Sequence, residues 1–385
     1  MKSQLLSLFQ RATMTLCFVA CSVWSAHAFY MAVPYTIERQ KMMVRAKVGS
    51  QVGNFVLDTG APCTLTNAFA KRAGITGGQL MSFSDSNGLP IRMRVTSLNN
   101  LVLGGINFME LQAVVLEPGN IMEQMGADGI IGYNLLRQGI VKFDSRQHLF
   151  ILTDQRDSLN LDYNYCSELL PNSYVPLIPI RLGTQVDTVM FDSGAESLYE
   201  MSTTSYRRMQ SDTTSIRVLG HGFGTLSAGA GGIEAQSEKW RLLAPTMYVG
   251  AAPFARVTTI TTDADDSRIG FPLLYYGDVV IDYEDGFFYF MPHDASHTPD
   301  VYEPDWNVVP VFNGQHIVAG IVWNADAAGI QSGDRIVAFG NQRIDQTDMR
   351  TATMQGGFNL SPEGTTITYF NARTQREEQV RIRME

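Results

Sequence analysis

The chain has 385 residues, of which 45% are hydrophobic and 17% are charged. This length and apolar content allow two or three globular domains with buried cores, and they exclude a chain that is disordered throughout. The formal net charge of −9, without any cluster of Lys and Arg, argues against a nucleic-acid-binding surface, which needs a basic stripe.

Residues 1–28 are predicted to be an export signal. Basic residues precede the apolar run Met14–Trp24, and Ala26-His27-Ala28 places small residues where a signal peptidase reads them. The run is shorter than the ~20 apolar residues of a membrane-spanning helix. We therefore expect an exported, periplasmic or secreted protein. The alternative is a lipid anchor at Cys21, because the residues before it loosely resemble a lipobox.

The first elements after the signal are strands. Residues 42–48 alternate as a half-buried strand does, and a turn at residues 49–51 leads into a strand that ends at Asp58. Residues 67–74 read as a short helix that ends at glycine. Residues 81–95 predict a hairpin with its turn at Asn87-Gly88, and we expect this hairpin to lie over Asp58.

The segment around Asp58 is repeated later in the chain. Residues 49–61 align without a gap to residues 183–195, at an offset of 134 residues (192 minus 58). In both copies three apolar residues precede Asp-Thr/Ser-Gly-Ala. The duplication therefore supplies two carboxylates, Asp58 and Asp192, in equivalent places at tight turns.

Two further matches extend the repeat. Residues 101–108 resemble residues 247–254 at an offset of 146, and residues 131–144 align to residues 269–282 at an offset of 138. The change in offset predicts an insertion in the second copy. The glycine-rich stretch 220–232 lies within it and suggests a mobile loop or a hairpin tip.

Strands dominate both copies, so we predict a mainly β fold with two β-barrel lobes related by pseudo-twofold symmetry. The predicted lobes span residues 29–160 and 161–293. A polar, proline-punctuated linker follows at residues 294–305. Residues 306–385 are predicted to form a small third domain of α+β type.

If the lobes pack about a pseudo-twofold axis, Asp58 and Asp192 meet at their interface. Two carboxyl groups in contact cannot both ionise cheaply, so one keeps a proton while the other acts as a base. Such a pair activates a water molecule against a peptide carbonyl. Gly60 and Gly194 allow close backbone approach, and the Thr59 and Ser193 hydroxyls are placed to hydrogen-bond across the interface.

These two motifs, each followed by an apolar-Gly element, resemble the two halves of a bilobal aspartic protease over residues 35–293. The resemblance is to a single-chain arrangement as in pepsin, with retropepsin-like motifs that end in Ala. It implies an acid-protease β-barrel fold, peptide-bond hydrolysis by Asp58 and Asp192, and a peptide or protein substrate held in an extended cleft under flaps. It implies no metal and no organic cofactor.

The flap and loop positions give the candidate substrate-binding residues, which are Phe83, Ser84, Gly222 and Phe223. Two features depart from the family pattern. Arg268 stands where the first copy has Ile130, and the predicted flap lacks the tyrosine usual in pepsins. Because Ala61 and Ala195 carry no hydroxyl to donate to the acid pair, we expect activity nearer neutral pH than in pepsins.

Residues 322–344 resemble the glycine-rich run of bacterial protease-associated PDZ domains, with Gly329, Gly333, Asp334 and Ile336 as the matching core. PDZ domains bind C-terminal peptides by strand addition and hold the carboxylate in a backbone nest. The candidate carboxylate-binding loop is Asn313, Gly314, Gln315 and His316.

Other candidate sites are weaker. His293 and His297 lie in the linker without a third zinc ligand, and the acidic residues at 263–266 lack the spacing of a calcium loop. Whether Cys63 and Cys166 pair is left open.

The function that we predict is an exported aspartic endopeptidase. Its PDZ-like domain would recognise a substrate or partner. The alternative is an envelope peptide-binding or scaffold protein that keeps the protease fold without turnover.

Overall fold

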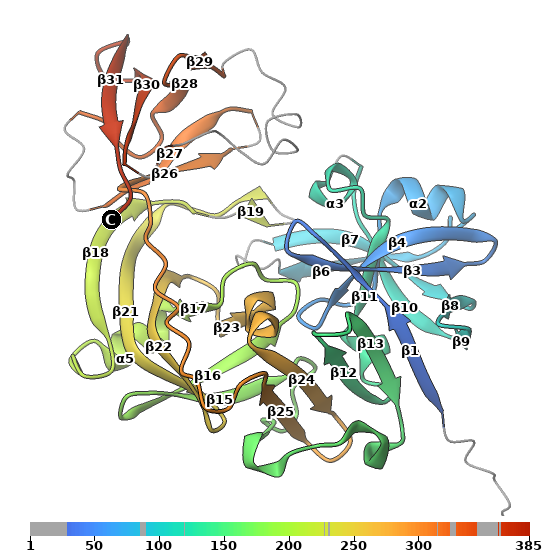
Figure 1. The fold of residues 1–385 in the computed structure, drawn as a ribbon. Coiled ribbons are helices and arrows are strands. Elements are labelled where there is room, and N and C mark those ends of the chain that lie inside the picture. The colour runs from blue at the N-terminus through green and yellow to red at the C-terminus, as the bar shows by residue number, and fades with distance from the viewer. Residues whose placement is uncertain are drawn as a thin grey trace, which may run out of the picture.

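The computed structural model describes residues 29–84, 90–118, 120–226, 228–229, 232–313, 315–323, 329–344, 361 and 363–385 (Figure 1). The fold is mainly β, as predicted, and its helices are short. The expected export signal at residues 1–28 and the expected hairpin turn at Asn87-Gly88 lie outside the described residues.

The first copy of the repeat forms the right-hand part of the molecule in Figure 1. Its elements are β1 (Tyr30–Pro34), β2 (Thr36–Glu38), β3 (Lys41–Val48), β4 (Gln51–Asp58), β5 (Thr64–Leu65), α2 (Asn67–Arg72), β6 (Gln79–Ser84), β7 (Pro90–Leu98), β8 (Leu101–Leu103), β9 (Ile106–Phe108), β10 (Leu111–Val115), α3 (Ile121–Gln124), β11 (Gly129–Gly132), α4 (Tyr133–Leu136), β12 (Ile140–Asp144) and β13 (Leu149–Thr153).

The second copy follows after two 3₁₀ turns, Arg156–Leu159 and Tyr163–Tyr165. Its elements are β14 (Cys166–Glu168), β15 (Leu177–Leu182), β16 (Gln185–Asp192), β17 (Tyr199–Ser202), α5 (Thr203–Met209), β18 (Arg217–Gly224), β19 (Ala228–Gly229), β20 (Gly232–Ile233), β21 (Ser237–Val249), β22 (Ala252–Thr262), β23 (Ser267–Gly270), the 3₁₀ helix η3 (Phe271–Tyr275), β24 (Gly277–Asp282) and β25 (Phe287–Pro292).

The segments expected from the sequence to be strands and a helix fold as such. Helix α2 begins after Thr66, whose side chain accepts the N–H of Phe69 and so caps the helix. Beyond its C-terminal end, Gly74 takes a positive φ of 72°. Strands β6 and β7 pair antiparallel, so the two arms of the predicted hairpin are confirmed.

The two copies build sheets with the same order of corresponding strands. The first copy has the order β6-β7-β10-β5-β11-β4-β3-β8-β9, and the second has β15-β16-β23-β17-β22-β21-β18. In the first copy, β3 precedes the acid strand and also pairs with β8. In the second copy, β15 precedes the acid strand and also pairs with the end of β21, which corresponds to β8 in the repeat. These pairings curl both sheets toward barrels.

A third sheet joins the copies, with the order β1-β13-β12-β24-β25-β14. Its central pair, β12 and β24, consists of corresponding strands that run antiparallel, with Ile140 opposite Asp282. An antiparallel pair of equivalent strands has a local twofold axis. The two copies are therefore related by an approximate twofold rotation at this sheet, which belongs to both of them.

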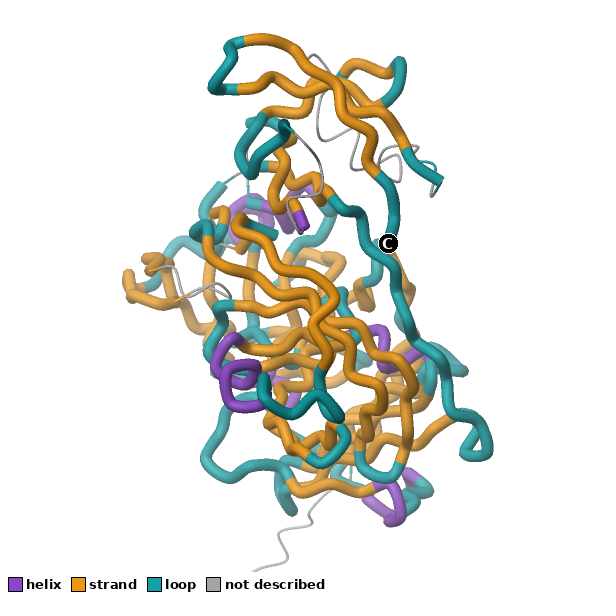
Figure 2. Tube along the Cα trace, turned by 90° about the vertical axis from the view of Figure 1, so that its left-hand side faces the viewer, coloured by secondary structure: helices purple, strands orange, loops and turns teal. Residues whose placement is uncertain are grey.

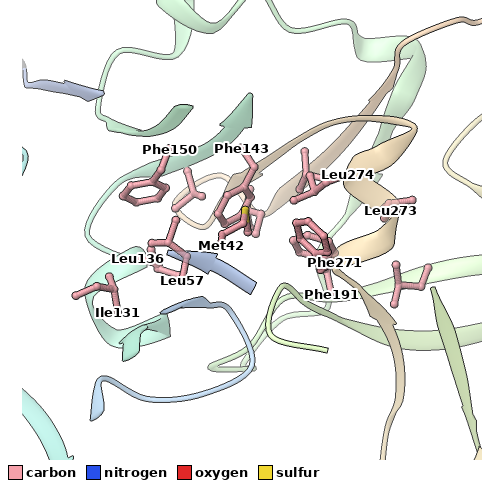
Figure 3. Close-up of a cluster of buried hydrophobic side chains, with 14 of the residues drawn as sticks. Met42, Leu57, Ile131, Leu136, Phe143, Phe150, Phe191, Phe271, Leu273 and Leu274 are labelled. Atoms are coloured by element: carbon pink, nitrogen blue, oxygen red, sulfur yellow. The ribbon is translucent and has the colours of Figure 1, made fainter. Parts of the chain in front are cut away.

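One hydrophobic core continues across both copies beneath the acid turns. The Phe143 ring lies 6.2 Å from that of Phe191, which lies 5.5 Å from that of Phe288. Figure 3 shows this cluster, with Leu57 and Phe191 reaching it from the ends of β4 and β16. Leu57 and Phe191 immediately precede the two acids, so packing of this core fixes where the acid turns begin.

The C-terminal segment, residues 306–385, has its own smaller core. Its strands are β26 (Val308–Phe312), β27 (Ile317–Val322), β28 (Arg335–Phe339), β29 (Gln342–Arg343), β30 (Thr365–Asn371) and β31 (Arg376–Ile382). The helical part of the predicted α+β domain is not among the described residues of this segment.

The glycine-rich motif of the C-terminal segment makes a tight turn. Gly329 and Gly333 have positive φ angles of 105° and 93°, which favour glycine. Asp334 is buried and accepts the N–H of Gln331 at 2.9 Å and of Ala372 at 3.2 Å. Its carboxylate thus ties the turn to the loop that follows β30.

Of the two alternatives for the glycine-rich stretch 220–232, the hairpin tip is confirmed for its second part, whereas its first part is a strand. Its first part is strand β18, and the short pair β19–β20 forms a hairpin tip beyond it. A Cβ on Gly222 would lie 2.7 Å from the Val322 carbonyl oxygen, and one on Gly224 would overlap the Gly320 carbonyl. The glycines therefore serve close packing of β27 on β18, since side chains there would hold the strands apart.

The predicted linker is packed against the second copy. Thr258 Oγ1 donates to the Glu303 carbonyl at 3.2 Å, and the Arg241 guanidinium donates to the Glu385 carbonyl at 2.7 Å. Asp305 and Glu385 also exchange two backbone hydrogen bonds. Figure 2 shows the linker as a long loop beside the strands of the second copy.

We predict that Gly224→Val separates the C-terminal segment from β18, because the added side chain overlaps the Gly320 backbone. Limited proteolysis should then cleave residues 294–305 at least about tenfold faster than in the wild type, since local opening exposes the linker. The matched control is Phe223→Val on the same strand, where the side chain is 55% exposed. Equal cleavage of the two variants would contradict the prediction.

Candidate active site

Each acid ends a buried strand that pairs in parallel with an apolar-Gly strand. Asp58 lies opposite Gly132 in the β4–β11 pair, and Asp192 lies opposite Gly270 in the β16–β23 pair. A Cβ on Gly270 would lie 2.7 Å from the Ala195 carbonyl oxygen, and one on Gly132 would overlap the Ala61 carbonyl. These glycines let each acid turn fold back onto the neighbouring strand.

Arg268, the departure from the family pattern, occupies a position that tolerates polarity. It lies opposite Met190, as Ile130 lies opposite Val56, and both Arg268 and Ile130 remain partly exposed. The Arg268 guanidinium is 3.8 Å from the carboxylate of Glu200. This position therefore holds an apolar residue in the first copy and a charged one in the second, whereas both copies keep the glycine.

Four hydrogen bonds cross between the two acid turns. The Thr59 N–H donates to Ser193 Oγ at 3.0 Å, and the Ser193 N–H donates to Thr59 Oγ1 at 2.9 Å. The Thr59 hydroxyl donates to the Phe191 carbonyl at 2.6 Å, and the Ser193 hydroxyl donates to the Leu57 carbonyl at 3.0 Å. Thr59 and Ser193 are fully buried. The expected bonding of these hydroxyls across the interface is confirmed.

The crossed bonds bring the two carboxyl groups together. The Asp58 and Asp192 side chains lie next to each other, each against the glycine of the opposite turn. A Cβ on Gly60 would lie 2.7 Å from Asp192 Cγ, and one on Gly194 would overlap the Asp58 carboxylate. Each glycine is therefore required because the acid of the other copy occupies the space of a side chain.

Backbone N–H groups orient both carboxylates. Asp58 Oδ1 accepts the N–H groups of Gly60 at 2.9 Å and Ala61 at 3.0 Å. Asp192 Oδ1 accepts the N–H of Gly194 at 2.9 Å, while the Ala195 N–H donates to the Asp192 main-chain carbonyl. Fixed donors of this kind hold each acid in one orientation before any substrate binds.

Burial raises the pKa of Asp58 well above the ordinary carboxyl range, and the nearby charge of Asp192 raises it further. The Gly60 N–H and the positive charge of Lys41 act in the opposite direction. Both acids stay partly exposed at the surface. Asp58 therefore keeps its proton to higher pH than an ordinary carboxyl group does, while both acids remain open to a ligand.

Lys41 is a residue of this site that sequence reasoning missed. Its ammonium group donates to the Gly194 carbonyl at 2.5 Å and lies 2.9 Å from the Glu196 carboxylate. Nothing in the sequence marks it, because it stands 17 residues before Asp58 (58 minus 41) at the beginning of an ordinary strand. Only the packing of the two copies brings it to the second acid turn.

The other candidate substrate-binding residues do not form one group. Phe83 and Ser84 lie in β6, opposite Ile91 and Pro90 of β7. Gly222 packs against β27 of the C-terminal segment, and Phe223 points away from that contact with 55% exposure. Assigning Gly222 to substrate binding is therefore wrong, because the C-terminal segment covers its open side.

The candidate carboxylate-binding loop forms the turn between β26 and β27. Asn313 Oδ1 accepts the N–H groups of Gln315 at 3.0 Å and His316 at 2.8 Å, and the Asn313 N–H donates to the His316 carbonyl. Gly314 lies outside the described residues. The described N–H groups of this loop are thus already bonded within the turn and leave no vacant nest.

A separate cavity lies away from the acid pair. A space of about 350 Å³ opens between the second copy and the linker, lined among others by Tyr199, Lys239, Arg241 and Asp305. Neither Asp58 nor Asp192 lines it. Its polar groups mostly bond one another, as the Lys239 ammonium does with Glu234 at 3.1 Å.

The cysteines and histidines singled out in the sequence have structural surroundings. Cys63 and Cys166 are both free thiols. Cys63 is buried and accepts the Gly132 N–H at 3.3 Å, and burial raises its pKa to about 12. The His293 ring lies 2.8 Å from Ser145 Oγ. Within the described ranges, no three His, Cys, Asp or Glu side chains gather as a metal site would require.

Comparison with protein families points to the same turn. Residues 44–135 match the aspartyl protease family. The matched segment contains Asp58, Thr59 and Gly60 of the first acid turn and ends before the second copy begins. No curated protein matches the chain at the level of significance applied. None of the helices in the described part of the chain combines the length and apolar character needed to cross a membrane.

We predict that Thr59→Val and Ser193→Ala each lower the free energy of unfolding by about 1–3 kcal/mol. Each change leaves a buried N–H and a buried carbonyl of the opposite turn without a partner. Urea unfolding monitored by fluorescence gives the measurement. The control is Thr36→Val on exposed strand β2, which should change the free energy by no more than about 0.5 kcal/mol. Losses no larger than in this control would contradict the prediction.

Proposed function

We propose that this chain is an exported, bilobal aspartic endopeptidase in which Asp58 and Asp192 act as one catalytic pair. The observation that carries this proposal is the placement of each carboxyl group against the glycine of the opposite turn, held by hydrogen bonds that cross between the repeat copies. The aspartyl protease match of residues 44–135 supports a protease-type function and a peptide or protein substrate.

In the proposed reaction, the pair holds one proton and one negative charge. The ionised carboxylate takes a proton from a water molecule as the water oxygen attacks the peptide carbonyl carbon. The protonated carboxyl donates its proton to the carbonyl oxygen, giving a tetrahedral intermediate. The C–N bond then breaks as the protonated carboxyl gives its proton to the amide nitrogen and the ionised carboxylate takes a proton from a hydroxyl of the intermediate, whose oxygen re-forms the C=O bond. The products are a carboxylic acid and an amine, and the pair again holds one proton.

The second half of the site supports the proposal although it lies outside the matched segment. β16, β23 and the turn at Asp192 repeat the register of β4, β11 and the turn at Asp58. An isolated Asp-Thr-Gly turn would have an ordinary structural explanation, because Asp and Gly are common in turns. Two such turns in carboxyl contact do not, since mutual repulsion makes the arrangement costly without a use.

We further propose that the C-terminal segment is a PDZ-like domain that recognises a peptide. Support comes from the positive-φ glycines and the buried Asp334 of its motif. In the sheet of described residues, β26 is an edge strand, while β27 lies between β26 and β28. Strand addition would therefore use the edge of β26.

Export remains a proposal that rests on the sequence of residues 1–28. The rival function is an envelope scaffold that retains the protease fold without turnover. The paired acids favour the enzyme, because a binding module gains nothing from keeping two repelling carboxyl groups in contact.

We predict that residues 29–385 cleave a diverse peptide mixture, and that Asp58→Asn and Asp192→Asn each reduce the rate by at least about a thousandfold. Mass spectrometry of the products over pH 3–8 measures the rate and gives the cleaved bonds. Asp265→Asn, a change of an exposed acid in the second copy, is the control and should keep the wild-type rate. A wild type that leaves every peptide intact would favour the scaffold function.

We predict a pH profile of kcat/KM that peaks nearer neutral pH than that of an ordinary carboxyl pair. Because burial and the charge of Asp192 raise the pKa of Asp58, the acid member of the pair keeps its proton as the pH rises, and activity falls only above that raised pKa. Initial rates with one cleaved peptide measure the profile. A maximum below about pH 4, the range of an unperturbed carboxyl, would overturn the expectation.

A further inference from the structure

Lys41 connects the first copy of the repeat to the acid turn of the second. It stands at the beginning of β3, and its side chain reaches the turn that follows Asp192. The ammonium group donates to the Gly194 carbonyl at 2.5 Å and lies 2.9 Å from Glu196 Oε1. Only 14% of the Lys41 side chain is exposed, so the stem is packed and the charged group is directed inward.

This contact has no counterpart on the other side of the pseudo-twofold axis. At the offset of 134 residues, Lys41 corresponds to Val175 and Glu196 to Pro62. Neither Val175 nor Pro62 carries a charge, so the Asp58 turn lacks the ion pair that the Asp192 turn has. The asymmetry is a property of this chain's residues, since the strands around both turns match in register.

The two contacts of Lys41 differ in strength. The Glu196 side chain is 62% exposed, and a pair with one partner so open to solvent contributes little. The bond from the ammonium group to the Gly194 carbonyl is charge-assisted and lies deeper in the interface. Gly194 itself packs on the Asp58 carboxylate, so a shift of its peptide changes the spacing of the acids.

The charge of Lys41 also acts on the acid pair. It acts on Asp58, and the Glu196 carboxylate faces it on the turn. A positive charge near two carboxyl groups that share one proton favours the singly ionised state over the neutral one. Glu196 opposes this effect, because its negative charge partly offsets that of the ammonium group.

We propose that Lys41 is a positioning residue of the acid pair: its ammonium group holds the Gly194 peptide and places a positive charge beside the pair. The proposal rests on the proposed protease function for its kinetic consequences, but the contact itself does not depend on turnover. Lys41 does not touch the reacting atoms and is no catalytic residue in that sense.

The test uses the chain from residue 29 to 385 with Lys41→Met, Lys41→Arg and Glu196→Gln. In Lys41→Met, kcat/KM should fall about tenfold or more, and the acidic limb of its pH profile should move to higher pH by roughly half a unit or more, because the neighbouring positive charge is lost. In Glu196→Gln the limb should move to lower pH or stay in place. Lys41→Arg keeps the charge and should keep the limb of the wild type.

Lys47→Met is the matched control, because it removes the same charge from an exposed position of the same strand. It should leave both the rate and the profile unchanged. A limb that stays in place in Lys41→Met, or that moves equally in Lys47→Met, would overturn the proposed effect of the charge. A purely structural role would lower the rate of Lys41→Met without moving the limb.

A second measurement separates failure of this proposal from failure of the protease function. The free energy of unfolding is measured for Lys41→Met and Glu196→Gln, which needs no activity. We expect Lys41→Met to lower the free energy of unfolding clearly more than Glu196→Gln does, because it also removes the charge-assisted bond to the Gly194 carbonyl. Equal effects of the two changes would overturn the proposed hold of Lys41 on the turn. A larger loss in Lys41→Met in a chain that cleaves nothing would retain that hold and reject the protease function alone.

Discussion

The hydrogen bonds that Thr59 and Ser193 exchange are the constraint on which the rest of the structure depends. Each acid turn leaves a backbone N–H that only the hydroxyl of the other turn satisfies. A buried N–H without a partner is costly, so neither turn is complete unless the two copies are assembled. The joining sheet, with its central β12–β24 pair, and the shared core then follow as the means by which the copies are held in register.

Contacts made through glycine recur at the places where separate parts of the chain meet. Gly60 and Gly194 admit the opposite acid, and Gly222 and Gly224 admit strand β27. In both places a single added carbon would separate surfaces that must touch. The lack of a side chain at these glycines thus has two effects. It lets the two carboxyl groups come close together, and it lets the C-terminal segment pack on the second copy.

The symmetric frame carries asymmetric chemistry. The strands that hold the two acids agree in length and register, yet Lys41 contacts the second acid turn. In addition, Asp58 Oδ1 accepts two backbone N–H groups, whereas Asp192 Oδ1 accepts one. A pair of acids that shares one proton needs its two members in different states at any moment. Differences around equivalent positions are therefore the features through which such a pair is tuned.

The sequence by itself determined the acid pair, the mainly β fold and the matching turns, because a duplicated motif places equal residues in equal local surroundings. It also indicated the hairpin arms, helix α2 and the glycine motif of the C-terminal segment, all of which depend on neighbours along the chain. Tertiary structure alone decided that Lys41 contacts the second acid turn and that β27 packs over Gly222. It also decided that the N–H groups of the loop at Asn313 are already hydrogen-bonded. These depend on contacts between segments far apart in the chain, for which local pattern carries no signal.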